Sequence, residues 1–189
     1  MNRSASAFAI TLSLAAATAV GAESDAGYRV LFSKPQPALS DADEREIFEQ
    51  TGMAANGSGG LSIEGCGDVD ASVELVDLNG DGRVEVFVLF GNTCWSGMAG
   101  SNLLLFVRDT AGHFQPNLGF PAAAYTPLSV GNGGFPDLQV SGPGFCDGVW
   151  RWDGASYQHR CNLATGPGGC DFDGHQCPDS SSLEPRDAQ

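Results

Sequence analysis

Residues 73–90 read VELVDLNGDGRVEVFVLF and place two alternating apolar segments on either side of a short acidic loop. Before the loop, Val73 and Leu75 flank a polar residue, and after it apolar residues recur at every second position from Val84 to Phe90. A period of two is that of a β-strand, because successive side chains point to opposite faces of a sheet. The pattern therefore predicts two antiparallel strands joined by the loop.

Other short apolar segments extend this pattern, separated by turns rich in Gly, Pro and Asn. They lie at residues 28–32, 103–107, 113–118, 138–140 and 149–152. Trp150 to Tyr157 predicts a hairpin that turns at Asp153-Gly154. We therefore expect a mainly β fold of antiparallel sheets, arranged as a sandwich or a partial propeller.

One helix is expected ahead of the sheets. Ser40 is placed to cap a helix over residues 41–51, and acidic residues fill its first turn. Ile47 and Phe48 would be the buried side chains of that helix.

The first residues have the pattern of a signal peptide. A positive start precedes an apolar, alanine-rich run, and small residues end it at Ala22, after which we predict cleavage. No other segment approaches the roughly 20 apolar residues of a membrane span. We expect a periplasmic or secreted protein with one β-rich domain over residues 23–177 and a disordered polar tail over residues 178–189.

The chain is strongly acidic, with a formal net charge of −14. Such a surface repels nucleic acid and anionic lipid, and it attracts cationic partners. We therefore expect no nucleic-acid or membrane partner. The charge is equally consistent with solubility alone.

Six cysteines follow residue 22, an even number that predicts up to three disulfides in an exported chain. They are Cys66, Cys94, Cys146, Cys161, Cys170 and Cys177. They form no C-x-x-C pair, and the histidines complete no zinc pattern. A two-residue turn at Asp153-Gly154 would place Cys146 opposite Cys161, and the other pairings stay open.

The acidic loop predicts a calcium site. Oxygen-bearing side chains occupy positions 1, 3, 5 and 9, and position 7 would offer its carbonyl: Asp77, Asn79, Asp81, Glu85 and Arg83. Calcium takes six to eight oxygen ligands, and glycines allow the tight curl that gathers them. An EF-hand would need a Glu at position 12, which is Val88, so we expect a strand–loop–strand site of structural role. An Asx-rich turn without a metal is the alternative.

Five segments carry a family resemblance: VDLNGDG at 76–82, GNTCWSG at 91–97, GFPD at 134–137, GPGFC at 142–146 and VWRWDG at 149–154. The loop resembles those of FG-GAP and VCBS-type repeats. The order of the segments resembles small periplasmic proteobacterial proteins with one such loop, similar in kind to immunity proteins of type VI secretion peptidoglycan amidase effectors. The resemblance implies a Cys94–Cys146 disulfide and a loop inserted into the effector's active-site cleft.

The residues favour a binding protein over an enzyme, because no G-x-S-x-G nucleophile elbow is present and the clustered carboxylates belong to the predicted calcium site. The expected partner is a basic secreted protein such as a peptidoglycan hydrolase. The candidate contact residues are Trp95, Ser96, Met98, Ser101 and Phe135, although each aromatic could instead pack in the core. A calcium-dependent glycan-binding or adhesion module and an uncharacterised hydrolase are the alternatives.

Overall fold

The computed structural model describes residues 26–171, 175–178 and 183–186. The predicted signal peptide lies outside these ranges. The described chain confirms the mainly β prediction: two antiparallel sheets of six and four strands carry three disulfides.

The six-stranded sheet is a meander whose neighbouring strands follow one another in the chain. Its strands are β1 (Met53–Ala55), β2 (Leu61–Ile63), β3 (Gly67–Val76), β4 (Glu85–Gly91), β5 (Asn102–Arg108) and β6 (Phe114–Pro121). The two strands predicted around the acidic loop are β3 and β4, which pair from Val76 opposite Glu85 to Asp70 opposite Gly91. Antiparallel strands that follow one another in the chain can pair through short connections, because no crossover is needed.

The four-stranded sheet is a second meander, of order β10-β9-β8-β7. Its strands are β7 (Ala124–Asn132), β8 (Phe135–Ser141), β9 (Cys146–Trp152) and β10 (Tyr157–Ala164). The predicted hairpin is β9–β10, but its turn is longer than expected: Tyr157 pairs with Trp152, and Asp153 N donates to Ser156 O at 2.9 Å.

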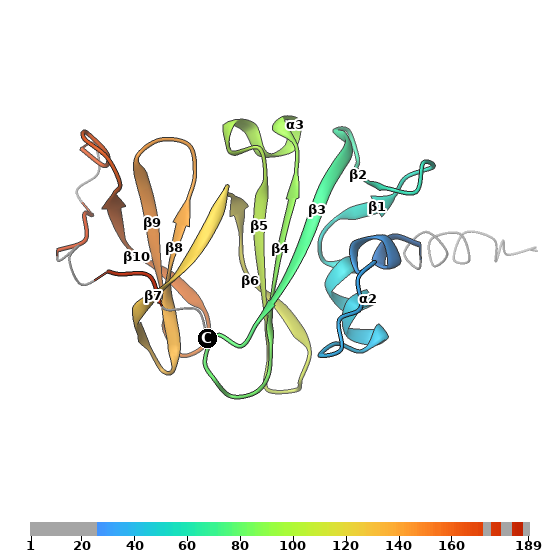
Figure 1. Ribbon diagram of the computed structural model, residues 1–189, viewed down its shortest axis with the longest axis horizontal. Helices are drawn as coiled ribbons and strands as arrows, with labels where there is room; N and C mark the ends of the chain where they lie inside the picture. The colour runs from blue at the N-terminus through green and yellow to red at the C-terminus, as the bar shows by residue number, and fades with distance from the viewer. Residues whose placement is uncertain (1–25, 172–174, 179–182, 187–189) are drawn as a thin grey trace, which may run out of the picture.

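The two sheets pack face to face, and helices cover the outer face of the larger sheet (Figure 1). Alternate residues of β4 divide between two cores: Val86 and Val88 pack toward the helices, and Phe87 packs toward the smaller sheet. Phe87 stacks on Tyr125 of β7 with ring centroids 3.6 Å apart. Both faces of β4 are thus buried, which explains its nearly continuous apolar sequence.

The predicted helix is α2 (Asp41–Glu49), which buries Ile47 and Phe48. Ser40 caps it in a capping box, because Ser40 Oγ accepts from Asp43 N and Asp43 Oδ2 accepts from Ser40 N. The strand predicted for residues 28–32 is wrong: residues 26–31 are helical. Three apolar side chains of that segment, at helical spacing, enter the core beside α2: Tyr28, Leu31 and Phe32.

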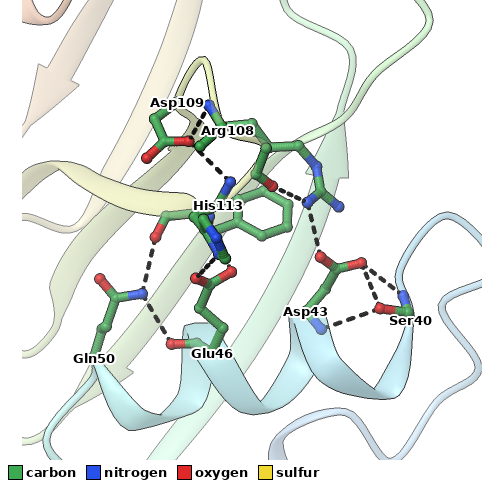
Figure 2. A network of polar contacts seen from close by, with 10 residues as sticks. Ser40, Asp43, Glu46, Gln50, Arg108, Asp109 and His113 are labelled. Atoms are coloured by element: carbon green, nitrogen blue, oxygen red, sulfur yellow. Dashed lines mark hydrogen bonds and ion pairs between the residues drawn. The ribbon is translucent and has the colours of Figure 1, made fainter.

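Polar contacts hold α2 against the β5–β6 hairpin (Figure 2). Arg108 Nη1 donates to Asp43 Oδ1 at 2.7 Å and to the Gly112 carbonyl at 2.8 Å. Glu46 accepts from Phe114 N at 3.0 Å and contacts His113 Nδ1 at 2.9 Å. The helix is therefore fixed to the sheet by charged as well as apolar contacts.

The connections fall at two ends of the sheets (Figure 1). The acidic-loop end comprises residues 77–84, 109–113, 133–134 and 153–156. The α3 end comprises residues 64–66, 92–101, 122–123 and 142–145, and it includes α3 (Thr93–Ser96) and the 3₁₀ helix η1 (Gly97–Ala99).

The disulfides are Cys66–Cys94, Cys146–Cys170 and Cys161–Cys177, so both expected pairings are wrong. Cys94 follows β4 and meets Cys66, which precedes β3, because β3 and β4 are paired neighbours. The longer turn of the β9–β10 hairpin and a bulge shift the register, so that Cys146 faces Ala164 instead of Cys161.

Residues 183–186 add to the edge of β7, which differs from the disorder predicted for the tail. Ser129 N donates to Glu184 O and Arg186 N donates to Pro127 O, both at 2.8 Å. Leu183 is buried on the outer face of the smaller sheet, where an apolar cluster would otherwise meet water. Residues 179–182 and 187–189 of the predicted tail lie outside the described ranges.

Candidate functional site

The acidic loop curls around the carboxylate of Asp77. Oδ1 accepts from Gly80 N at 2.7 Å and from Asp81 N at 3.1 Å, and Oδ2 accepts from Gly82 N at 2.8 Å. The curl requires left-handed backbone at two positions, where Gly80 has φ 74° and Gly82 has φ 82°. The tight curl of the loop was therefore predictable from the positions of its two glycines.

Two further side chains of the loop fix its second half. Asn79 Oδ1 accepts from Asp81 N at 3.0 Å, and Asp81 Oδ1 accepts from Arg83 N at 2.8 Å. These short-range contacts are Asx turns, in which a side-chain oxygen takes the place of a backbone acceptor. The loop is therefore closed by its own hydrogen bonds.

Glu85 is the most buried carboxylate of the loop, with 3% of its surface exposed. Its Oε2 accepts from Leu78 N at 2.8 Å. Burial raises the pKa of Glu85 to about 7, and the neighbouring carboxylates of Asp81 and Asp77 act in the same direction. Both effects favour the protonated, uncharged form of Glu85 over the carboxylate.

A cavity of about 160 Å³ lies beside the loop and is lined by four of the five residues predicted to bind calcium. These are Asn79, Asp81, Arg83 and Glu85, and the remaining walls are Val107, Arg108, Phe135 and Trp152. The oxygen-rich donor set suits a hard cation. In this conformation, however, no three His, Cys, Asp or Glu side chains of the described residues are grouped closely enough to hold a metal.

At the α3 end, two of the predicted contact residues are exposed. Trp95 is 50% exposed and Met98 is 87% exposed, although the segment that carries them is firmly held. Asn92 caps α3 by accepting from Cys94 N and Trp95 N, and it donates to the Cys66 and Asp68 carbonyls.

The two predicted serines serve the fold instead. Ser96 is buried, and its Oγ accepts from Asn102 Nδ2 at 2.8 Å. Ser101 Oγ donates to the Ala122 carbonyl at 2.6 Å. The two serines therefore hold the start of β5 and the segment between β4 and β5 in place.

Phe135 is not brought together with the other candidates. It is buried near the acidic-loop end, where its ring stacks on Trp152 at 4.3 Å and meets the edge of Tyr157. Phe135 is therefore packed in the core, which was the alternative given for each aromatic residue. Its sequence surroundings, rich in glycine, gave no sign of this burial.

Phe145 is a further candidate, outside the residues predicted from the sequence. The residue is 61% exposed in the β8–β9 connection. In the sequence, Phe145 directly follows Gly-Pro-Gly, a pattern typical of a turn. A large apolar residue in a turn has no strand to bury it, so this pattern could have indicated its exposure.

No described helix is long and apolar enough to span a membrane. Three disulfides in a chain of this size are typical of an exported protein in an oxidising compartment. No protein-family model matches the chain, and neither a curated protein nor a solved structure shows significant similarity to it.

Proposed function

We propose that this chain is an exported binding protein, stabilised by calcium, that docks on a basic secreted protein through the connection between β4 and β5. The single observation that supports this proposal is the exposure of Trp95 and Met98 on a fixed segment. Large apolar side chains held in water are typical of interaction sites, and tryptophan is enriched among residues that dominate binding energy.

The segment is organised before any partner arrives. The Cys66–Cys94 disulfide ties its start to the β2–β3 turn, with Cα atoms 5.6 Å apart. The Asn92 contacts and the buried Ser96 hydroxyl fix the backbone on either side of Trp95. A fixed loop loses little conformational entropy on docking, which favours affinity.

The charge of the chain and its family resemblance indicate the class of partner. A net charge of −14 favours a cationic protein, and wall hydrolases are often cationic because their substrate is anionic. The resemblance to immunity proteins of peptidoglycan amidase effectors points in the same direction. We therefore infer an inhibitor or immunity protein of the periplasm, without catalytic activity of its own, whose loop enters the cleft of a cell-wall amidase.

Binding and inhibition of purified cationic peptidoglycan amidases, measured by calorimetry and wall-digestion assays, test this function. We expect Trp95→Ala and Met98→Ala each to weaken binding by about tenfold or more, the loss expected when an anchor residue is truncated. Gln115→Ala, an exposed change on β6, is the matched control. Unaltered binding and inhibition by both loop variants would refute the proposal.

Calcium belongs to the proposal as a stabilising ion. Its ligands would be the oxygens of Asp77, Asn79, Asp81 and Glu85 and the carbonyl of Arg83. When bound, the ion supplies positive charge among three carboxylates and ties β3 to β4. The donor set and the adjoining cavity support this assignment. The exposed Trp95 lies at the α3 end, away from the acidic loop, so its position does not favour a glycan site around the ion (Figure 1).

Chelation tests the ion directly. Saturating calcium is expected to raise the melting temperature of the chelated protein by about 5–10 °C, the shift that corresponds to ligand at 100 times its dissociation constant in a domain of this size. Asp81→Ala is expected to abolish the shift, and Asp153→Ala in the β9–β10 turn to retain it. Superimposable melting curves with calcium and with chelator would exclude the site.

A further inference from the structure

Among the residues that the structure describes, three large hydrophobic side chains are exposed: Trp95, Met98 and Phe145. The first two lie between β4 and β5 of the larger sheet, and Phe145 lies between β8 and β9 of the smaller one. Both connections belong to the α3 end (Figure 1). Exposed apolar residues that gather at one end of a molecule indicate a contact surface more strongly than the same residues scattered singly.

The crossover between the two sheets joins these connections. Ala122 N donates to Ser101 O at 3.0 Å, and Ala123 N donates to Ser141 O at 2.8 Å. Ser101 lies three residues after Met98, and Ser141 lies four residues before Phe145. Residues 122–123 therefore link the start of one connection's flanking strand to the end of the other's, and bring the two connections to the same end of the sheets although Trp95 and Phe145 are 50 positions apart.

Phe145 is held as firmly as Trp95. The neighbouring Cys146 is bonded to Cys170, with Cα atoms 4.9 Å apart. The Phe145 carbonyl accepts from Thr165 N at 2.9 Å. Its ring lies over Gly166, where a Cβ atom would come within 2.9 Å of the ring. Each half of the α3 end thus carries an exposed ring beside its own disulfide.

The charge around these side chains has one sign. No Lys or Arg occurs between Arg45 and Arg83, between Arg83 and Arg108, or between Arg108 and Arg151. Four exposed carboxylates belong to this end or directly adjoin it: Glu64, Asp68, Asp70 and Asp171. Two of the arginines are engaged elsewhere: Arg108 bonds to the Gly112 carbonyl, and Arg186 bonds to the Leu78 carbonyl.

We propose that Trp95, Met98 and Phe145 form one docking face, spanning both sheets, for a protein that presents an apolar patch rimmed by Lys and Arg. This inference rests on the proposed function and enlarges its site from one inserted loop to two disulfide-anchored loops. A second copy of the chain is disfavoured as occupant, because it would bring the same carboxylates together. A basic partner satisfies both the apolar centre and the acidic rim.

Phe145→Ala tests the face in the calorimetric assay with a cationic peptidoglycan amidase that binds the wild-type protein. We expect the variant to lose about tenfold or more in affinity, with an unchanged melting temperature. Phe145→Leu, which keeps an apolar side chain, is expected to recover much of the loss. Glu64→Lys is expected to slow association at low salt, and Asp109→Lys at the other end to slow it less.

The outcomes separate the two proposals. Weak binding by Trp95→Ala together with wild-type affinity of Phe145→Ala would overturn the two-loop face and leave the proposed function standing. Failure of the purified cationic peptidoglycan amidases to bind the wild-type protein would overturn both proposals. A dimer in sedimentation that Phe145→Ala dissociates would identify a second copy as the occupant and refute the basic partner.

Discussion

Asp137 shows how this fold accommodates a charge in its interior. Its carboxylate is completely buried in β8, and arginines of β9 and β10 reach it. Arg151 Nε and Nη2 donate at 2.8 and 2.9 Å, and Arg160 Nη1 donates at 2.7 Å. Both arginines are only about one-third exposed, so the group ties three strands together where water contributes little screening.

Asp137→Asn is expected to lower the free energy of unfolding by about 3 kcal/mol, because it leaves two partly buried cations without their counter-charge. Urea denaturation at neutral pH measures the change. Asp70→Asn, at an exposed position, is the control and should stay within about 0.5 kcal/mol of the wild type. An equally small loss of unfolding free energy for Asp137→Asn would show that water stabilises the two arginines without their counter-charge.

At the scale of the element, α2 is fixed to β5 by a charge whose effect depends on pH. The hydrogen bond from Arg108 lowers the pKa of Asp43 from 3.8 to about 2, and the capping bonds from Ser40 act in the same direction. The folded pKa lies below the unfolded one, so this group stabilises the fold above about pH 4. The contribution is lost as the pH falls toward 2.

Asp43→Asn is therefore expected to cost about 1–2 kcal/mol at pH 7, after allowance for solvent screening. The difference from the wild type should shrink steadily between pH 5 and pH 2. Chemical denaturation of both proteins across this range provides the measurement. A difference that is the same at pH 7 and at pH 2 would mean that the ionised carboxylate is not responsible.

Local patterns predicted those elements whose residues interact with near neighbours in the chain. The alternation around the acidic loop gave β3 and β4, and Ser40 gave the start of α2. Residues 28–32 were misread because β-branched and aromatic residues favour strands. The 1-4-5 spacing of Tyr28, Leu31 and Phe32 was the better signal, since it places all three on one helical face.

The disulfide pairing and the exposure of the candidate contact residues could not be predicted in the same way. Both depend on packing between segments that are far apart in the sequence. Cys66 and Cys94 are neighbours only because β3 and β4 pair, and Cys146 misses Cys161 because of a longer turn and a bulge. Phe135 and Trp95 both occur in glycine-rich surroundings. Phe135 lies in the core between the two sheets and Trp95 lies outside it, and the sequence does not reveal how the sheets are stacked.

At the scale of the whole molecule, the fold is a stack of layers: helices, the six-stranded sheet and the four-stranded sheet (Figure 1). Residues 183–186, here called the cover, lie against the outer side of the four-stranded sheet. Leu183 completes the outermost core with Leu128, Val149 and Cys161. Arg186 then bonds through Nη1 to the Leu78 carbonyl at 2.7 Å. The short cover therefore contacts both the smaller sheet and the acidic loop.

Leu183→Ala is expected to cost about 2 kcal/mol, because it removes a buried side chain and leaves a cavity against the sheet. Thermal unfolding followed by circular dichroism measures the loss. Glu184→Ala, which alters an adjacent exposed side chain, is the control. If both variants melted with the wild type, the cover would contribute nothing to stability.

The contact between Arg186 and Leu78 also constrains the order of folding, since it joins residues 108 positions apart. Each sheet is built from one continuous stretch of chain: residues 53–121 form the six-stranded sheet and residues 124–164 form the four-stranded sheet. Each sheet can therefore form as soon as its stretch has been synthesised. Residues 183–186 cannot join the edge of β7 at that point, because they follow both stretches in the chain and are synthesised after them. A chain stalled before residue 183 would hold two formed sheets with the outer edge of β7 still open, and that edge could pair with a strand of a neighbouring molecule.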